Sequence, residues 1–300
     1  MVAGLLSVFL LFAPMSGSQD IPWSPFEWTG RSFGDTTFAR VALMVPVRLQ
    51  GRSEVFRMQL DTGCNVSMVY ETPFEDLRYR ARPVEGRESF VSLGGAVGGF
   101  SFDSFPFLVY EDFGSPLKEQ GEHPLIGTVG LDMLVGKVLV LDYPNRRFCL
   151  VDSVAGELET LVSRAAFVDV QVRNDKLFLP LRIGGTDFEG FFFDTGTSML
   201  PLTTRPDIWR RITHRSGEEA DNVRIDVPSW GKKVTLVGAP VEGSVGIGAL
   251  EVPNPLAYYA STGLVETEGI IGNALFYDEN VIIIDLIHSR FGVLKSGAAD

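Results

Sequence analysis

The sequence has 300 residues and a formal net charge of −12, from 26 Lys and Arg against 38 Asp and Glu. Apolar residues make up 45% of the chain and charged residues 21%, which excludes intrinsic disorder over most of its length. The acidic balance excludes the basic surface expected of a nucleic-acid-binding protein. The length predicts about two domains at ~150 residues each. The 32 Gly, 17 Pro and 22 Phe favour many short strands and turns over long helices.

The first residues of the chain, 1–15, form an uncharged apolar segment. This segment is short for a membrane-spanning helix, which needs ~20 apolar residues, and the small residues Ser16 and Ser18 follow it. We therefore predict a signal peptide over residues 1–18, cleaved after Ser18, and an extracytoplasmic protein, secreted or periplasmic. Retention of the apolar segment as a membrane anchor is the alternative, because no Lys or Arg precedes it.

An internal repeat organises the rest of the chain. Residues 45–63 and residues 179–196 share an apolar-Pro-apolar-Arg-apolar start, a glycine turn, a second apolar run and a final Asp-Thr-Gly. In both copies a proline lies 12 residues after the aspartate, at Pro73 and Pro206, and opens a short helix-compatible stretch. Each copy therefore predicts a β-hairpin whose second strand ends at Asp-Thr-Gly, followed by a short helix.

A second pair of segments repeats further along the chain. Residues 128–151 and residues 270–294 both contain two apolar residues and a glycine, a short amphipathic stretch, a run of aliphatic residues, an aspartate, a turn and Arg-Phe. The aliphatic runs, 138–141 and 281–284, predict strands that are buried on both faces.

The repeat divides the chain into two related β-rich lobes of ~130 residues each. We predict an N-terminal extension over residues 19–37 and an N-terminal lobe over residues 38–152. A linker over residues 153–166 leads to a C-terminal lobe over residues 167–295, and residues 296–300 form a tail.

Asp61 and Asp194 stand at the ends of apolar strands, where a carboxylate is costly to bury alone. Two such carboxylates that face each other across a pseudo-two-fold axis can share one proton, because like charges ~3 Å apart cannot both ionise. The pair then titrates as a unit and holds one acid and one base side by side. That arrangement can deprotonate a water molecule while it protonates a carbonyl oxygen.

The two Asp-Thr-Gly motifs, each with a downstream apolar-apolar-Gly segment, resemble those of the aspartic peptidases, and their presence in one chain resembles the pepsin-like branch of that family. The resemblance covers residues 38–295. It implies an all-β, bilobal pepsin-like acid protease fold, with two related β-barrel-like lobes and an active-site cleft between them. It also implies a monomeric endopeptidase that acts on a peptide or protein substrate, with no metal, no cofactor and no covalent intermediate.

The resemblance assigns roles residue by residue. Asp61 and Asp194 become the catalytic pair that activates water for attack on a peptide bond. The threonines of the two motifs interlock the loops, and the glycines let backbone N–H groups approach the carboxylates. The residues that support the pair in these ways are Thr62, Gly63, Thr195, Gly196 and Thr197. Thr197 carries the hydroxyl that the family often places after the glycine. Cys64 stands at the equivalent place without a hydroxyl, where the retroviral branch commonly has Ala.

The family also closes a β-hairpin flap over its substrate. Residues 90–105 are rich in glycine and similar to the flaps of retroviral peptidases, with a mobile tip between stiffer strands. The residues predicted to bind substrate from this flap are Leu93, Gly94, Gly95, Ala96, Val97 and Gly98. The segment lacks the tyrosine that pepsin-like enzymes usually present, and residues 237–249 are its candidate counterpart in the second lobe. A plain hairpin turn is the alternative for the glycine cluster.

The cysteines, the histidines and the N-terminal segment give further expectations. Cys64 and Cys149 are expected to be buried thiols, with a single disulfide as the alternative, and the three histidines fit no metal-ligand spacing. Residues 19–37 are short for a pepsin-type pro-segment, so we expect activity without zymogen processing. Two alternatives to the peptidase are a catalytically silent pepsin-fold module that binds peptides or acts like an inhibitor, and a glycosidase, whose carboxyl groups would lie ~5 Å or more apart.

Overall fold

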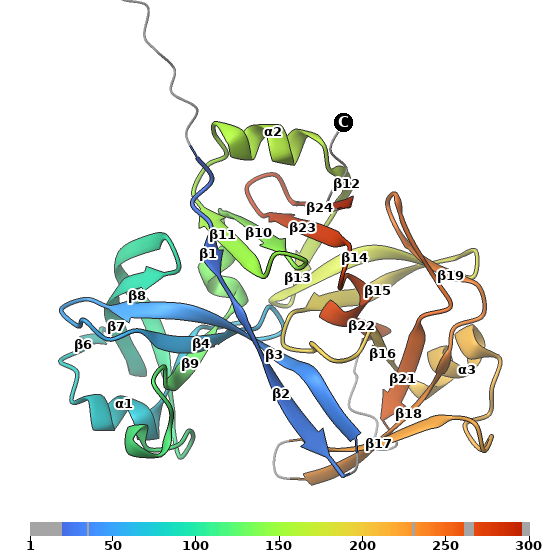
Figure 1. Cartoon of the computed structure of the whole chain (residues 1–300), viewed down its shortest axis with the longest axis horizontal. Coiled ribbons are helices and arrows are strands. Elements are labelled where there is room, and N and C mark those ends of the chain that lie inside the picture. The colour runs from blue at the N-terminus through green and yellow to red at the C-terminus, as the bar shows by residue number, and fades with distance from the viewer. Residues whose placement is uncertain (1–19, 35, 230–231, 261–266, 296–300) are drawn as a thin grey trace, which may run out of the picture.

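The computed structural model describes residues 20–34, 36–229, 232–260 and 267–295. The predicted signal peptide and the predicted tail lie outside these residues. The described part of the chain is built mainly from β-strands in three sheets, with a few short helices between them (Figure 1). No helix of the described residues is long and apolar enough to cross a membrane.

The N-terminal lobe contains an eight-stranded sheet in the order β2-β3-β4-β9-β5-β8-β7-β6 (Figure 1). Its strands are β2 (Glu27–Phe33), β3 (Thr36–Leu49), β4 (Phe56–Leu60), β5 (Met68–Tyr70), β6 (Arg82–Val84), β7 (Arg87–Val97), β8 (Phe100–Tyr110) and β9 (Leu125–Val129). The accompanying helices are α1 (Glu71–Leu77) and the 3-10 helices η1 (Leu117–Glu119) and η2 (Leu131–Leu134).

The C-terminal lobe contains a ten-stranded sheet whose main path is β17-β18-β21-β16-β22-β15-β14-β19-β20, with β13 paired to β14. Its strands are β13 (Gln171–Arg173), β14 (Lys176–Ile183), β15 (Thr186–Asp194), β16 (Leu202–Thr204), β17 (Val223–Ser229), β18 (Lys232–Pro240), β19 (Ser244–Ile247), β20 (Leu250–Pro253), β21 (Leu256–Ala260) and β22 (Gly269–Gly272). The accompanying helices are α3 (Pro206–Thr213) and the 3-10 helix η3 (Asn273–Leu275).

The two lobe sheets repeat one strand order. The path β4-β9-β5-β8-β7-β6 matches the path β15-β22-β16-β21-β18-β17, including which neighbours run parallel and which antiparallel. Helices α1 and α3 follow equivalent strands, and each ends on a residue in the left-handed conformation, Arg78 and His214. The predicted all-β chain of two related lobes is confirmed.

A six-stranded sheet joins the lobes, in the order β1-β11-β10-β23-β24-β12. Its strands are β1 (Ser24–Pro25), β10 (Val138–Asp142), β11 (Arg147–Val151), β12 (Ala166–Asp169), β23 (Asn280–Asp285) and β24 (Arg290–Lys295), and helix α2 (Glu157–Ser163) lies between β11 and β12 in the chain. The central strands β10 and β23 pair antiparallel and are buried throughout, as their aliphatic runs predict. Each lobe therefore supplies half of a common sheet.

The turns of this joint sheet are held by the same ion pair in both lobes. Asp142 accepts a hydrogen bond from Arg147 Nε at 2.7 Å, and Asp285 accepts one from Arg290 Nε at 2.7 Å. The guanidinium of Arg147 lies 4.3 Å from the ring centre of Trp23, and that of Arg290 lies 4.1 Å from the ring centre of Phe167. The two aspartates thus stabilise equivalent turns.

Segments outside the two predicted lobes also form regular structure. The range 19–37, predicted as an extension, contains β1 and β2, and β2 pairs with β3. The β2–β3 hairpin reaches the C-terminal lobe, where Arg40 pairs with Asp278 at 2.9 Å and the rings of Phe33 and Phe38 pack against an apolar cluster. The range 153–166, predicted as a linker, contains α2.

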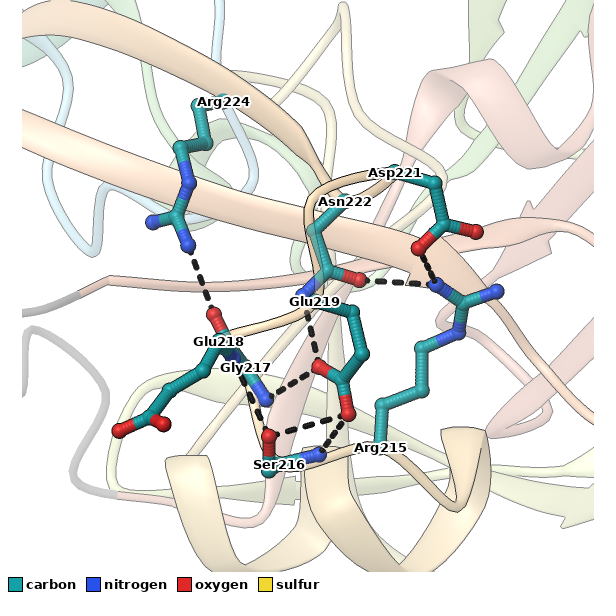
Figure 2. A network of polar contacts seen from close by, with 8 residues as sticks. All are labelled: Arg215, Ser216, Gly217, Glu218, Glu219, Asp221, Asn222 and Arg224. Atoms are coloured by element: carbon teal, nitrogen blue, oxygen red, sulfur yellow. Dashed lines mark hydrogen bonds and ion pairs between the residues drawn. The ribbon is translucent and has the colours of Figure 1, made fainter.

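A polar network orders the loop that follows α3 in the C-terminal lobe (Figure 2). The Glu219 carboxylate accepts the backbone N–H groups of Ser216 at 2.8 Å and Gly217 at 2.9 Å. Mainly through the Ser216 N–H, these bonds lower the pKa of Glu219 to about 2. Beside it, Arg215 pairs with Asp221 at 2.7 Å. The loop is therefore organised around one ionised carboxylate.

Candidate active site

Each Asp-Thr-Gly motif begins where a strand in the interior of its sheet ends. In β4 the buried residues alternate, so Phe56, Met58 and Leu60 face the core. The Asp61 N–H then bonds the Val129 carbonyl of the parallel strand β9 at 3.0 Å. The strand before Asp194 is anchored in the same way by β22, which runs parallel to β15. The backbone around both aspartates is therefore fixed by a parallel neighbour.

The glycine of each motif lies against the aspartate of the other lobe. A Cβ added at Gly63 would come within 2.5 Å of Asp194 Cγ, and one added at Gly196 within 2.5 Å of Asp61 Cγ. Real Cβ atoms essentially never approach another heavy atom closer than 3.0 Å. Only glycine fits at these two positions, and its absence of a side chain lets the two carboxyl groups come together across the lobe interface.

The two carboxyl groups affect each other's ionisation across the lobe interface. Burial raises the pKa of Asp61 well above its usual value, and the negative charge of Asp194 and the side-chain hydrogen bond between the two groups raise it further. Such a pair titrates as a unit and retains one proton over a range of pH.

The threonines of the two motifs interlock the lobes behind the carboxyl groups. Thr62 N donates to Thr195 Oγ1 at 2.9 Å, and Thr195 N donates to Thr62 Oγ1 at 3.0 Å. Their hydroxyls donate in turn to the carbonyls of Phe193 at 3.1 Å and Leu60 at 2.9 Å. Both threonines are fully buried, so every one of these polar atoms needs its partner.

Asp194 accepts more hydrogen bonds than its partner. Its Oδ1 accepts the backbone N–H groups of Gly196 at 2.7 Å and Gly63 at 3.2 Å, and its Oδ2 accepts the Thr197 hydroxyl at 2.8 Å. Hydrogen bonds donated to a carboxylate favour its ionised form. The negative charge of the pair is therefore better accommodated on Asp194.

The Asp61 side of the pair is less well supplied with donors. Asp61 Oδ1 accepts the Cys64 N–H at 3.1 Å, and Oδ2 accepts Gln59 Nε2 at 3.4 Å. The Cys64 thiol points elsewhere and donates to the Val66 carbonyl, with 3.2 Å between the heavy atoms. The hydroxyl bond that Thr197 makes in the second lobe thus has no equivalent in the first, as the sequence indicates.

Neither cysteine is suited to act as a nucleophile. Burial, and then the charge of Asp61, raise the pKa of Cys64 to about 11. Burial raises the pKa of Cys149 to about 12. Both are free thiols, as expected, although Cys64 is half-buried and only Cys149 is fully buried. A thiol that stays protonated is a poor nucleophile.

The downstream apolar-apolar-Gly segments pack against the backs of the two Asp-Thr-Gly loops. A Cβ at Gly130 would lie 2.6 Å from the carbonyl carbon of Val66, and one at Gly272 would lie 2.2 Å from the Thr197 carbonyl oxygen. The residue after each glycine bonds the loop, as Leu131 N donates to the Cys64 carbonyl at 2.8 Å. The glycine of each segment therefore permits close backbone contact with the loop.

Asn273, which the sequence did not single out, follows Gly272 and supports the second Asp-Thr-Gly loop. This residue is fully buried, and its Nδ2 donates to the Thr195 carbonyl at 2.7 Å and to Ser198 Oγ at 2.9 Å. Its Oδ1 accepts the Tyr143 hydroxyl at 2.6 Å. The signal that could have found it is an amide residue next to a glycine in an otherwise apolar segment.

The predicted flap lies at the wrong end of the sheet to cover Asp61. Its residues Leu93, Gly94, Gly95, Ala96, Val97 and Gly98 form the last part of β7 and the turn into β8. Val47 of β3 pairs with both Val97 and Phe56, so the turn is level with the start of β4, five residues before Asp61. A Cβ at Gly98 would contact Ser24 and Phe148 of the joint sheet.

The hairpin on the Asp61 side of the sheet is β6–β7. Across the sheet, Thr128 pairs with Met68, Met68 with Leu108, and Leu108 with Phe90 of β7. This line runs from the end of β4 to the part of β7 that joins β6. The turn at 85–86 is exposed, and nothing lies within 4 Å of a Cβ at Gly86. The candidate flap is therefore the short β6–β7 hairpin.

Residues 237–249, the predicted counterpart of the flap in the second lobe, lie away from Asp194, just as the glycine turn of the first lobe lies away from Asp61. It contains the end of β18 and all of β19, and Val245 of β19 pairs with Ile183 of β14. Ile183 in turn pairs with Thr186, at the start of β15 and far along the strand from Asp194. The hairpin equivalent to β6–β7 is β17–β18, and its turn lies outside the described residues.

No protein-family model matches the sequence, and no curated protein matches it. An aspartic proteinase from Irpex lacteus is similar in structure, with a TM-score of 0.50 and 11% identity over 86% of this chain and 95% of that one. Basic 7S globulin from soybean has a TM-score of 0.49 and 10% identity, over 93% of this chain and 98% of that one. Conglutin gamma, a basic 7S globulin from lupine seeds, has a TM-score of 0.48 and 9% identity, over 91% of this chain and 94% of that one.

The likeness to the Irpex lacteus protein shows a pepsin-like fold, which confirms the predicted architecture. At 11% identity it shows the fold alone. Within the described ranges, no group of three or more His, Cys, Asp or Glu side chains is placed to hold a metal ion.

Proposed function

We propose that this chain is an aspartic-type endopeptidase that hydrolyses peptide bonds with a water molecule activated by Asp61 and Asp194. The observation that carries the proposal is the reciprocal contact in which Gly63 and Gly196 each lie against the aspartate of the opposite lobe. That contact supports a single carboxyl pair made from both lobes, which neither lobe can complete alone. The raised pKa of Asp61 supports a proton retained between them.

The different hydrogen bonds of the two aspartates suggest different roles in this reaction. Asp194, which accepts three donors, is the base that takes a proton from water as the water oxygen bonds the carbonyl carbon. Asp61 holds the shared proton and gives it to the carbonyl oxygen. When the tetrahedral intermediate collapses, the C–N bond breaks, Asp194 returns its proton to the amine and one hydroxyl returns a proton to Asp61. Both carboxyl groups then regain their starting states.

The substrate in this proposal is an extended segment of peptide. A peptide that pairs its backbone with a hairpin edge would find such an edge at β6–β7, on the Asp61 side of the N-terminal lobe. The exposed turn at 85–86 supports a hairpin that can adjust to the substrate.

The test is cleavage of a defined peptide library, over ~pH 3 to ~pH 8, by the wild type and by Asp61→Asn and Asp194→Asn. Each change keeps the shape of the side chain and removes an ionisable group, so each should lower kcat/KM by about 100-fold to 10,000-fold. Asp187→Asn is the matched control, because Asp187 lies on the same strand as Asp194 but pairs with Arg182 at the surface. Wild-type activity in either catalytic variant would rule out the mechanism.

A catalytically silent, peptide-binding or inhibitor-like module is the second candidate. It is favoured by one observation, namely that Cys64 gives Asp61 no hydroxyl bond. Such a module would bind library peptides without cleaving them at any pH in the range. An enzyme would instead cleave them and be inhibited by a peptide analogue with a hydroxyl in place of the scissile carbonyl.

A further inference from the structure

A lysine from the C-terminal lobe reaches into the catalytic loop of the N-terminal lobe. Lys176 is the first residue of β14, is half-buried, and its ammonium donates a hydrogen bond to the Gly63 carbonyl. Its Nζ also lies 5.4 Å from the ring centre of Phe192, next to the strand end that carries Asp194. The proposed reaction gives this lysine no role.

The peptide group between Gly63 and Cys64 connects this lysine to Asp61. Its carbonyl oxygen accepts the Lys176 ammonium, and its N–H donates to Asp61 Oδ1 at 3.1 Å. A cation on the carbonyl side of an amide polarises the group and makes its N–H a stronger donor. The positive charge of Lys176 therefore acts on the Asp61 carboxylate through one intervening amide.

We propose that Lys176 is a positioning residue that stabilises the ionised form of Asp61 through the Gly63–Cys64 peptide group, and so sets the pH range over which the pair holds one proton. This inference rests on the proposed function for its consequence in catalysis. The pH at which Asp61 ionises would then depend on a residue of the other lobe.

The charged groups around Asp61 differ in how they affect its ionisation. The titratable groups that face Asp61 or its loop are Asp194, Cys64, Tyr70 of β5, Asp132 of η2 and Lys176. Burial keeps Cys64 and Tyr70 neutral, since it raises the pKa of both. The charge of Asp194 disfavours a second negative charge, whereas Lys176 favours it. Removing the lysine should therefore make Asp61 harder to ionise.

The experiment is a titration of the aspartate carboxyl groups by ¹³C NMR, on full-length protein labelled at the aspartate side-chain carboxyl. Asp61→Asn identifies the Asp61 signal. Lys176→Met should raise the titration midpoint of Asp61 by about 0.5 to 1 pH unit. Lys176→Arg, which keeps the charge, should stay closer to the wild type than Lys176→Met does. Lys233→Met, which removes a charge from an exposed pair with Asp226, should leave the midpoint unchanged.

An unchanged Asp61 midpoint in Lys176→Met, or an equal rise in Lys233→Met, would overturn the proposal. If Lys176→Met does not fold, Lys176→Gln gives the same test, because it keeps a donor for the Gly63 carbonyl without the charge. The titration needs no turnover, so it gives an answer even if the chain cleaves no peptide. If the chain is active, the basic limb of kcat/KM should move up by the same amount as the midpoint, because Asp61 must keep its proton.

Discussion

The two Asp-Thr-Gly loops share a backbone and differ in what surrounds it. In both, the threonine hydroxyl crosses to the other lobe and the glycine lies against the opposite aspartate. The fourth residue breaks this symmetry, because the Thr197 hydroxyl bonds Asp194 while the Cys64 thiol bonds a carbonyl of its own loop. The comparison teaches that the shared features bring the carboxyl groups together, whereas the differing features decide where the proton stays.

Each loop is also held by a different partner from outside its Asp-Thr-Gly motif. The first loop receives the Lys176 ammonium at the Gly63 carbonyl. The second receives the Asn273 amide at the Thr195 carbonyl, at 2.7 Å. A charged donor supports one loop and a neutral donor supports the other, which extends the asymmetry beyond the fourth residue of the motif.

The largest effect is expected from breaking the feature that both loops share. Gly63→Ala and Gly196→Ala each place a methyl group where the carboxyl group of the opposite aspartate lies, so the pair must separate. A displacement of about 1 Å in a catalytic group can cost 100-fold in rate, and we expect at least that loss in kcat/KM for each variant. Gly121→Ala is the control, because nothing lies within 4 Å of its added Cβ. Near-normal activity in either variant would contradict the close approach.

The next largest effect concerns the stability of the interlock. Thr62→Val and Thr195→Val each remove a buried hydroxyl that both donates and accepts across the lobes. Leaving a buried partner unpaired costs about 1–3 kcal/mol, so we expect each variant to lose about 2–4 kcal/mol of unfolding free energy, by similar amounts.

Urea unfolding measures this loss, and the chain supplies a matched control. Thr203 in β16 is also buried, but its hydroxyl has no hydrogen-bond partner. Thr203→Val should therefore cost little or stabilise the protein. Unequal losses in Thr62→Val and Thr195→Val would show that the interlock is not symmetric.

A smaller effect is expected from making the two loops alike at the fourth residue. Cys64→Ser supplies a hydroxyl that can donate to Asp61, as Thr197 does to Asp194. Such a bond favours the carboxylate, so the pKa of Asp61 should fall and the basic limb of kcat/KM should move down by about 0.5 to 1 pH unit. The reverse change, Thr197→Val, should lower kcat by about 10-fold through loss of one charge-assisted hydrogen bond.

The pH dependence of kcat and of kcat/KM separates these two outcomes. Cys64→Ala is the control, since it removes the thiol and adds no donor. If Cys64→Ser and Cys64→Ala have the same basic limb, the fourth residue does not determine how the proton is held.

The smallest effect is expected in the loops that follow the equivalent helices α1 and α3. Only the second of these carries the Glu219 network, in which bonds to backbone N–H groups lower the pKa of Glu219 to about 2 from 4.5 (Figure 2). A lowered folded-state pKa gives stability that is present above the unfolded value and is lost as the pH falls through the folded value. Glu219→Gln should therefore lower the melting temperature near neutral pH, with the deficit shrinking from about pH 4.5 towards about pH 2.

Thermal unfolding at several pH values tests this expectation. Glu218→Gln is the control, because Glu218 is the exposed neighbour whose carboxyl group points away from the network (Figure 2). A deficit for Glu219→Gln that stays constant down to about pH 2 would mean that its charge does not organise the loop.

The repeat made most of the fold predictable. Matched spacing identified both motifs, and buried aliphatic runs identified β10 and β23, because these signals are local and periodic. The same spacing placed Asp61 and Asp194 at strand ends, where the structure has them. What the sequence could not supply was the pairing of distant segments.

The misplaced flap illustrates this limit. The glycines at 94–99 correctly indicated a hairpin turn, but which end of the sheet a turn occupies depends on register across several strands. Lys176 and Asn273 were missed for the same reason, since each contacts a loop that is distant in sequence. Lys176 is separated from Gly63 by 113 residues.

The central claim is that Asp61 and Asp194 share one proton, and the titration of Asp61 in Asp194→Asn tests it most directly. The ¹³C carboxyl signal of Asp61 would be followed in the wild type and in this variant. The account predicts a wild-type midpoint well above the usual aspartate value and a lower midpoint in Asp194→Asn, still raised by the burial that remains. The same midpoint in both proteins would contradict it.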